Sequence, residues 1–244
     1  MAPPSKYLPP CIVLGLETQI GLGIVRELGR AGVPVIGIAH EPDAIGLASR
    51  HLVRKLVVNP PRSPELMAAI RALGEEFGAC CLLAVSEANL SWLALHSDAF
   101  GRVHPIVPTR ETLAIVLDKQ RTLQAAREVG ISVPETVELW SMTQATALAD
   151  TFKFPAVLKW KDPNAVAPKL NANGLDLLKA EYVYTPEQFL AAARRYETLA
   201  EWPMVQSYCP GRGLGQFFYM RQGQAVRRFQ HIRVAEWPPE GGFS

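Results

Sequence analysis

The sequence has few of the residues from which metal centres and disulfide frameworks are built. It contains four cysteines in 244 residues, and none of them forms a Cys-x-x-Cys pair. His40, His51, His96 and His104 show no spacing typical of metal ligands. We therefore expect neither a metal site nor disulfides in this sequence. The cysteines are predicted to be buried free thiols in a reducing, cytoplasmic environment, and they are Cys11, Cys80, Cys81 and Cys209.

Charge of one sign and long apolar runs are also scarce. The formal net charge is only +2, whereas non-specific nucleic-acid binding needs a dense basic face. No apolar run is long enough to cross a bilayer. The N-terminal residues are rich in proline and lack the basic-then-apolar order of a signal peptide. We therefore expect neither nucleic acid nor a membrane as a partner.

Residues 10 to about 112 alternate short apolar runs with segments of helical periodicity. Hydrophobic residues make up 48% of the chain, which is enough for a sizeable core. The periodicity predicts parallel strands joined by right-handed helical crossovers. The predicted fold class is therefore α/β. It has about four parallel strands, which are expected at residues 11–15, 33–39, 79–85 and 103–107.

Glycines and a serine occupy two strand-to-helix turns of this region. Gly15, Gly21 and Gly23 invite a dinucleotide-binding interpretation, but their spacing is not Gly-x-Gly-x-x-Gly. Close packing of helix on strand, or contact with a substrate, explains them as well. Ser86, which follows the third predicted strand, is either a helix N-cap or part of a lip that holds an acceptor substrate.

From about residue 113 the pattern changes to that of an α+β domain. Short helices surround residues 118–119, and an apolar strand is predicted at residues 156–160. Residues 161–176 are polar, contain a single glycine and are expected to form a loop. A strand at residues 204–209 is followed by an antiparallel hairpin over residues 215–234.

Two lysines of this second region suggest a binding site for phosphate. Lys159 ends the apolar strand, and Lys119 stands at a helix boundary next to Asp118. Each lysine alone is typical of a solvated surface. Together, on two separate segments, they could place two ammonium groups against one polyphosphate.

The order of motifs resembles that of the ATP-grasp superfamily, in particular its carbamoyl-phosphate-synthase-like carboxylate–amine ligases. The matching segments, in order, are Asp118-Lys119, a helix leading to Gly130-Ile131 and Pro134, Phe154-Pro-Ala-Val-Leu-Lys159, Thr185-Pro-Glu187, and Val205-Gln-x-Tyr208-x-x-Gly211. The resemblance implies a Rossmann-like pre-ATP-grasp domain over 1–112 and an incomplete ATP-grasp domain over 113–244. Within the second domain it implies a lid at about 135–204 and the start of a catalytic subdomain at 205–244.

The resemblance also assigns roles to the residues that would bind the nucleotide. Lys119 and Lys159 would hold its phosphates, and the strand that contains Gln206, Ser207, Tyr208 and Cys209 would hold its base. The backbone at Ser207 and Cys209 would read the edge of the adenine. Gln206 stands where many relatives carry a glutamate, and its own role is open.

Two further segments are given a role by the resemblance. Arg233 would be catalytic, in contact with the transferring phosphate or the carboxylate, although a surface strand arginine explains it equally; the Gly241-Gly242 turn would approach the substrate. Residues 161–176 stand where relatives have a glycine-rich flap over the phosphates. Lys169 within that segment could add a cation, or simply be a solvated lysine.

The resemblance implies ATP and Mg²⁺ as cofactors, with the Mg²⁺ ligands expected beyond Ser244. The sequence is therefore expected to be either a truncated or a natural fragment that does not catalyse alone. In the intact parent, small-molecule carboxylate and amine substrates would be joined through an acyl phosphate. The alternatives are a non-catalytic nucleotide-binding module and a Rossmann NAD(P) oxidoreductase.

Overall fold

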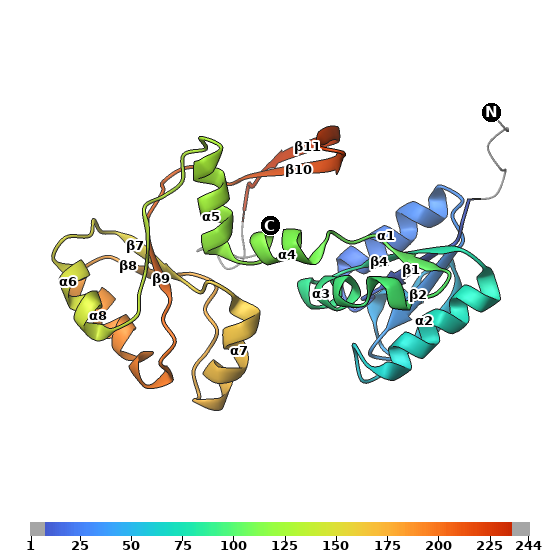
Figure 1. The fold of residues 1–244 in the computed structure, drawn as a ribbon, viewed down its shortest axis with the longest axis horizontal. Coiled ribbons are helices and arrows are strands. Elements are labelled where there is room, and N and C mark those ends of the chain that lie inside the picture. Colours follow the sequence, from blue (N-terminus) through green and yellow to red (C-terminus); the bar gives the residue numbers. More distant parts are fainter. Residues whose placement is uncertain (1–7, 236–244) are drawn as a thin grey trace. The chain divides into compact units, whose positions relative to one another are not determined.

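The computed structural model describes residues 8–235, and the chain divides into two compact units, Met1–Leu117 and Asp118–Ser244. Figure 1 shows the two units along the ribbon. Helix α4 (Arg110–Val116), which spans the boundary expected at 112/113, belongs to the first unit.

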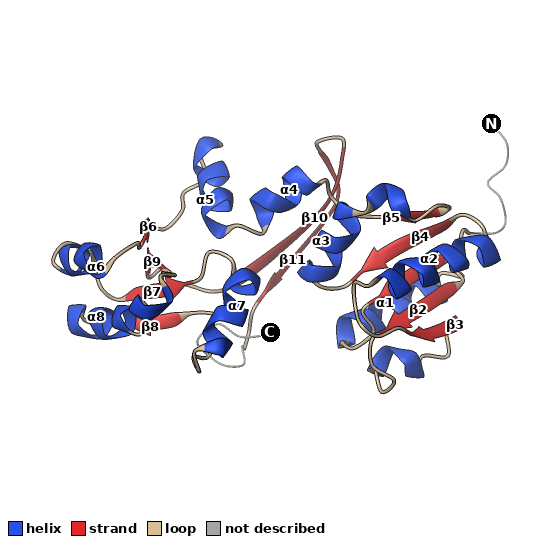
Figure 2. Cartoon of the chain, turned by 60° about the horizontal axis from the view of Figure 1, so that its bottom comes forward, coloured by secondary structure: helices blue, strands red, loops and turns tan. Residues whose placement is uncertain are grey.

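The first unit is built on a five-stranded parallel sheet with the strand order β3-β2-β1-β4-β5 (Figure 2). The predicted α/β fold class is thus confirmed. The elements are β1 (Cys11–Leu14), α1 (Gln19–Arg30), β2 (Val35–Ala39), η1 (Ile45–Ala48), β3 (Leu52–Val57), α2 (Pro64–Phe77), β4 (Cys80–Ala84), α3 (Glu87–Leu95), η2 (Ser97–Ala99), β5 (Val103–Pro105) and α4.

The sheet has one strand more than the sequence indicated. Strand β3 is an edge strand, and Arg54 and Lys55 in its middle are exposed. An edge strand needs no continuous apolar run, because only one of its sides pairs with the sheet. The four predicted strands are the ones that carry most of the buried residues, including Ile12, Leu14 and Leu82.

Close packing explains one of the three glycines at the first strand-to-helix turn. A Cβ atom on Gly21 would lie 2.4 Å from the carbonyl oxygen of Gly15, so helix α1 reaches the end of β1 only because Gly21 has no side chain. Gly15 itself has a φ of +101°, which favours glycine. A Cβ on Gly23, in contrast, would meet nothing within 4 Å.

The second unit contains a four-stranded antiparallel sheet of order β6-β9-β7-β8 and a separate hairpin, β10-β11. Helices α6 and α8 pack against each other, and their buried residues share a core with the sheet. The elements are α5 (Lys119–Glu128), β6 (Thr136–Glu138), α6 (Met142–Ala149), β7 (Ala156–Lys159), α7 (Pro163–Ala172), β8 (Glu181–Val183), α8 (Pro186–Arg194), η3 (Glu197–Leu199), β9 (Met204–Ser207), β10 (Leu214–Arg221) and β11 (Gln224–Ile232).

The prediction of a loop over residues 161–176 was wrong, because helix α7 occupies most of this segment. The Asp162 carboxylate accepts hydrogen bonds from the backbone amides of Asn164 (2.9 Å) and Ala165 (3.1 Å), and Pro163 occupies the first turn. Val166 and Leu170 lie one helical turn apart and are buried in a small core. Capping and an apolar stripe therefore form a helix here.

The prediction of four buried thiols was wrong for one of them. Cys11 and Cys80 are buried and Cys81 is half-buried, but Cys209 is exposed just beyond the end of β9. All four thiols are free. Burial is the main cause that raises the pKa of the Cys11 thiol to about 11. In residues 8–235, no helix combines the length and apolar character needed to cross a membrane.

Substitution of the two helix glycines tests the packing at the first turn. Gly21→Ala should destabilise the protein by about 1–3 kcal/mol, because the added carbon must displace backbone atoms. Gly23→Ala is the matched control and should leave stability unchanged or raise it by up to about 1 kcal/mol, because alanine favours the helix. Urea denaturation measures both effects. Equal midpoints for Gly21→Ala and the unmodified protein would contradict this explanation.

Candidate functional site

Lys159 ends strand β7 with its ammonium group directed at the neighbouring strand. The Lys159 Nζ donates a hydrogen bond to Oε1 of Gln206 at 3.0 Å. The two strands are antiparallel, with Lys159 opposite Met204 and Val157 opposite Gln206. A long side chain at the strand end therefore reaches a residue two positions further along its partner. Lys159 is half-buried, so it is not the fully solvated lysine that its position at a strand end could also have indicated.

A chain of hydrogen bonds fixes the orientation of the Gln206 amide. Its Nε2 donates to Oγ1 of Thr136 at 3.0 Å, and Thr136 Oγ1 in turn donates to the carbonyl oxygen of Pro134 at 3.0 Å. Because the threonine hydroxyl proton is used on Pro134, its oxygen must accept from the amide nitrogen. The amide oxygen of Gln206 is thus the group that faces Lys159. The Gln206 residue as a whole is only 8% exposed.

Lys119 belongs to the same neighbourhood as Lys159. Asp118 caps helix α5 by accepting hydrogen bonds from the amides of Gln120 and Arg121, which fixes Lys119 at the first helical position. The Lys119 backbone amide donates to the carbonyl oxygen of Lys161 at 3.4 Å. This bond ties the start of α5 to the segment that follows β7.

The positive charges of the two lysines repel each other. The pKa of Lys159 lies below its ordinary value, first because burial disfavours the charged ammonium and second because the positive charge of Lys119 repels it. The Cys209 thiol has the opposite, smaller effect on that pKa, since its thiolate form would attract the ammonium. The structure thus brings Lys119, Lys159 and Cys209 within electrostatic reach of one another.

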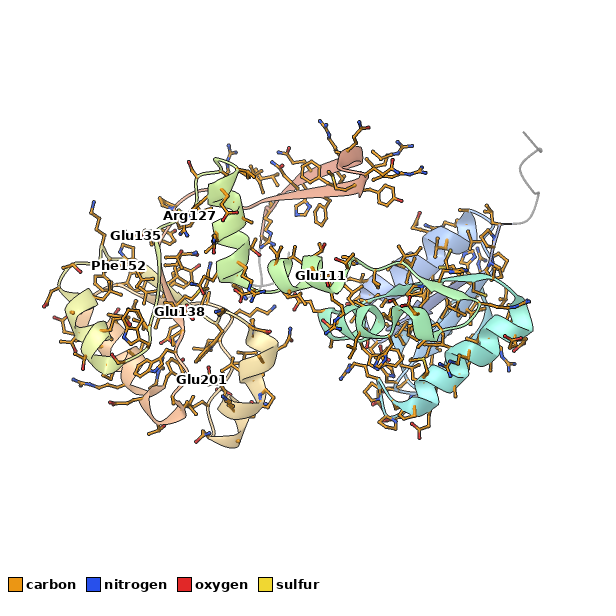
Figure 3. The ribbon with its side chains drawn as sticks, viewed as in Figure 1. Glu111, Arg127, Glu135, Glu138, Phe152 and Glu201 are labelled. Carbon is orange, nitrogen blue, oxygen red and sulfur yellow. The ribbon has the colours of Figure 1, made fainter. Side chains whose placement is uncertain are left out.

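The carboxylates of Asp118 and Glu138 are paired with a different lysine, Lys161. Lys161 Nζ lies 3.7 Å from Oδ2 of Asp118 and 3.5 Å from Oε1 of Glu138, which is labelled in Figure 3. Within residues 8–235, Lys159 itself forms no salt bridge. An amide, and not a carboxylate, is therefore its partner. No carboxylate within residues 8–235 therefore neutralises the positive charge of Lys159.

The end of strand β9 leaves part of its backbone available to a ligand. The amide of Ser207 donates to the carbonyl oxygen of Glu135 at 2.9 Å, and that of Tyr208 donates to the carbonyl oxygen of Pro155 at 3.2 Å. Within the described part of the chain, the Cys209 amide has no such partner. The Tyr208 ring is 43% exposed and meets the edge of Tyr182 at a centroid distance of 6.0 Å.

A cavity of about 310 Å³ lies beside this neighbourhood, on the side of Asp118 and Lys161. Its wall also includes Trp160, Lys169 and Glu201, and Lys169 forms an ion pair with Glu201. Lys169 is thus an exposed lysine, as its sequence position also indicated, and its ammonium group is paired with a carboxylate. Neither Lys119 nor Lys159 lines this cavity.

Hydrogen bonds to nearby backbone groups involve two further predicted residues, Arg233 and Ser86. The Arg233 amide donates to the carbonyl oxygen of Gly213 at 2.8 Å and closes the open end of the β10-β11 hairpin. Its catalytic role stays a prediction, and the Gly241-Gly242 turn lies outside the described residues. In the first unit, Ser86 caps helix α3 by accepting from the Asn89 amide at 3.3 Å. Ser86 has a φ of +99°, an unusual value for a residue with a side chain.

Comparisons with known proteins were made at the levels of sequence and structure. No known protein family matches the sequence, and no curated protein matches it either. Solved structures do match. N5-carboxyaminoimidazole synthetase from Staphylococcus aureus, complexed with ADP, has a TM-score of 0.67 at 11% identity over 93% of this chain and 55% of that one.

Two other enzymes show the same likeness. L-amino acid ligase from Bacillus licheniformis has a TM-score of 0.61 at 15% identity over 93% of this chain and 50% of its own. The biotin carboxylase domain of 2-oxoglutarate carboxylase from Hydrogenobacter thermophilus, in complex with MgADP, has a TM-score of 0.58 at 14% identity. The match covers 84% of this chain and 45% of that one. The chain therefore spans about half the length of the structures it matches. These likenesses confirm the expected resemblance at the level of the fold.

Substitution of Gln206 tests the electrostatic description of the site. Gln206→Glu should raise the pKa of Lys159 towards its ordinary value, because a carboxylate in hydrogen-bonding distance favours the ammonium form. Gln206→Met, which removes the acceptor without adding charge, should not raise that pKa. Both values can be measured by NMR titration of the lysine side chains. An unchanged pKa in Gln206→Glu would show that the two groups do not meet in solution.

Proposed function

We propose, from the premise that this chain has the fold of the ATP-grasp superfamily, that its second unit binds ATP. Lys119 and Lys159 hold the phosphates. The observation that carries this proposal is the pair of like charges, one of them half-buried and without a carboxylate partner in residues 8–235. Such a pair is unfavourable alone and becomes favourable when a polyphosphate lies against it.

The base of the nucleotide would contact the end of strand β9. Residues two apart on a strand direct their backbone groups to the same side, so Ser207 and Cys209 share one edge. The Ser207 amide is used within the sheet. We therefore assign the carbonyl oxygen of Ser207 as the acceptor for the adenine amino group and the amide of Cys209 as the donor to a ring nitrogen. The exposed ring of Tyr208 lies between them in sequence.

The whole protein is proposed to be a carboxylate–amine ligase. A carboxylate oxygen of one substrate attacks the terminal phosphorus of ATP, and ADP leaves. An amine then attacks the acyl carbon, and inorganic phosphate leaves. The chain's own contribution to this sequence is to bind and orient the nucleotide, since its lysines would neutralise charge on the phosphates. Arg233 is proposed to contact the transferring phosphate or the carboxylate.

The residues that the structure describes contain no cluster of side chains that would bind Mg²⁺. No group of three or more His, Cys, Asp or Glu side chains in residues 8–235 is arranged to hold a metal ion. The carboxylates of Asp118 and Glu138 form salt bridges with Lys161. We therefore assign no Mg²⁺ ligand to these residues and derive no step through the ion.

One observation favours a second candidate, a nucleotide-binding module without catalysis. Helix α7 occupies the segment where the resemblance places a glycine-rich flap in relatives. At the start of this helix, the Asp162 carboxylate already accepts hydrogen bonds from the amides of Asn164 and Ala165. Those amides are consequently not offered to a phosphate. A protein with the two lysines but without such a flap would bind ATP and could use it for regulation.

Removal of either lysine should weaken ATP binding. Lys119→Met and Lys159→Met should each raise the dissociation constant by about tenfold or more, the equivalent of one charge-assisted contact. Lys153→Met is the matched control, because Lys153 is exposed and precedes the same strand. Isothermal titration with ATP measures the effect, and titration with NADH tests the oxidoreductase alternative. Unchanged ATP affinity in Lys159→Met, or NADH binding in place of ATP binding, would overturn the proposal.

The exposed Cys209 thiol provides an independent probe of the nucleotide's position. Alkylation of Cys209 should slow by about tenfold when ATP saturates the site, because a nucleotide at the end of β9 covers the thiol. Peptide mass spectrometry identifies the modified cysteine, and the buried Cys80 is the internal control for unfolding. Alkylation of Cys209 at the same rate with and without bound ATP would place the nucleotide elsewhere.

Hydroxylamine trapping distinguishes the ligase from the binding module. A ligase supplied with ATP, Mg²⁺ and a panel of carboxylates should form a hydroxamate, because hydroxylamine captures an acyl phosphate. Tight ATP binding without a hydroxamate from any carboxylate would favour the non-catalytic module.

A further inference from the structure

A hollow on the first unit is lined by several basic side chains, none of which has a role in the proposed nucleotide site. It has a volume of about 420 Å³ and is lined by Arg26, Arg30, Arg50 and His51, together with the short residues Ala48 and Ser49. Arg26 and Arg30 lie one turn apart near the end of helix α1. Ala48 ends η1, and the other lining residues lie between η1 and β3. Two segments distant in sequence thus direct cationic groups into one concavity.

The local backbone is shaped to bring His51 against the helix. A Cβ atom on Gly29 would lie 2.4 Å from the Cβ and 2.6 Å from the Cγ of His51, so the imidazole is held directly against the helix backbone. The buried Ser49 hydroxyl accepts a hydrogen bond from the His51 amide at 3.3 Å and supports the turn. The glycine and the serine therefore position His51 against helix α1, in the same hollow that Arg26 and Arg30 line.

The positive charge in this hollow is poorly compensated. Arg30 is paired with Glu27 on the same helix. Arg26 and Arg50 form no salt bridge and no side-chain hydrogen bond with any residue of the described chain. Arg26 and Arg50 therefore bring two positive charges to one concavity without a counter-charge in the described chain, and a bound anion would balance them.

The position of the hollow separates it from the expected substrate edge. Helix α1 starts after the carboxyl end of β1 and ends before the amino end of β2, and His51 directly precedes β3. The hollow therefore lies at the amino edge of the parallel sheet. Ligands of open α/β sheets ordinarily bind at the carboxyl edge. A ligand in this hollow would therefore lie away from any substrate bound at the carboxyl edge of the sheet.

We propose that this hollow binds the phosphate monoester group of a small metabolite. Arg26 and Arg50 contact the phosphate oxygens, with Arg30 and His51 as additional donors. Guanidinium groups match the geometry and the charge of a phosphate dianion, whereas a single carboxylate would neutralise only one of them. The volume suits a small molecule and not an extended polymer. The proposal does not depend on ATP binding by the second unit.

Titration calorimetry of the full chain with glycerol 3-phosphate, and separately with inorganic phosphate, tests the proposal. Binding should saturate, and the double substitution Arg26→Gln with Arg50→Gln should weaken it by about a hundredfold, since each charge-assisted contact contributes about tenfold. The control is Arg194→Gln with Arg228→Gln, which removes the same net charge from exposed positions of the second unit and should leave affinity unchanged.

Two further measurements make the outcome decisive. Gly29→Ala displaces His51 without changing any charge, and it should also weaken glycerol 3-phosphate binding. Thermal denaturation of every variant verifies that it remains folded, and the arginine variants, altered only at exposed positions, should melt like the parent. Absence of saturable binding, or equal losses in the hollow variant and the control, would overturn the proposal.

Discussion

Electrostatic repulsion between Lys119 and Lys159 is the interaction on which the proposed nucleotide site depends. The fold places the first lysine at the start of a capped helix and the second at the end of a buried strand. Burial and the neighbouring positive charge together lower the pKa of Lys159. A protein that only had to be stable would gain by removing one of these charges, since a half-buried ammonium without a counter-charge is costly. The proposed anionic ligand would offset this cost.

The surroundings of Lys159 preserve this charge imbalance. A glutamate in place of Gln206 would neutralise the ammonium, whereas the amide only orients it. Thr136 and Pro134 hold the amide in the required orientation. Lys161 engages Asp118 and Glu138, so these carboxylates do not neutralise the site. The polar groups around Lys159 therefore fix its direction while leaving its charge for a ligand.

Much of the fold could be predicted from the sequence, and the failures have physical causes. The buried strands of the first unit are continuous apolar runs, but the edge strand β3 carries Arg54 and Lys55 and gave no such signal. Helix α7 was predicted to be a loop because the segment contains several asparagines and prolines. The sequence also contains the helix signals, which are the N-cap Asp162, Pro163 in the first turn, and the spacing of Val166 and Leu170. The superfamily resemblance was confirmed at the level of the fold, with matching structures of 10–16% identity.

The site was predicted less completely than the fold. The order of motifs singled out both lysines, because each stands at the boundary of a recognisable element. Thr136, which is 70 residues from Gln206, was missed because a contact between two strands leaves no local signal. Lys161 was missed because its pairing with Asp118 and Glu138 requires three segments to meet. Only the folded chain reveals such contacts.

The most direct test of the central claim is the pKa of the Lys159 ammonium, measured by NMR with and without ATP. If the phosphates lie against the two lysines, ATP should raise this pKa, because the anion stabilises the charged form and offsets the repulsion from Lys119. The same pKa in the presence and absence of saturating ATP would contradict the claim that these lysines form the nucleotide site.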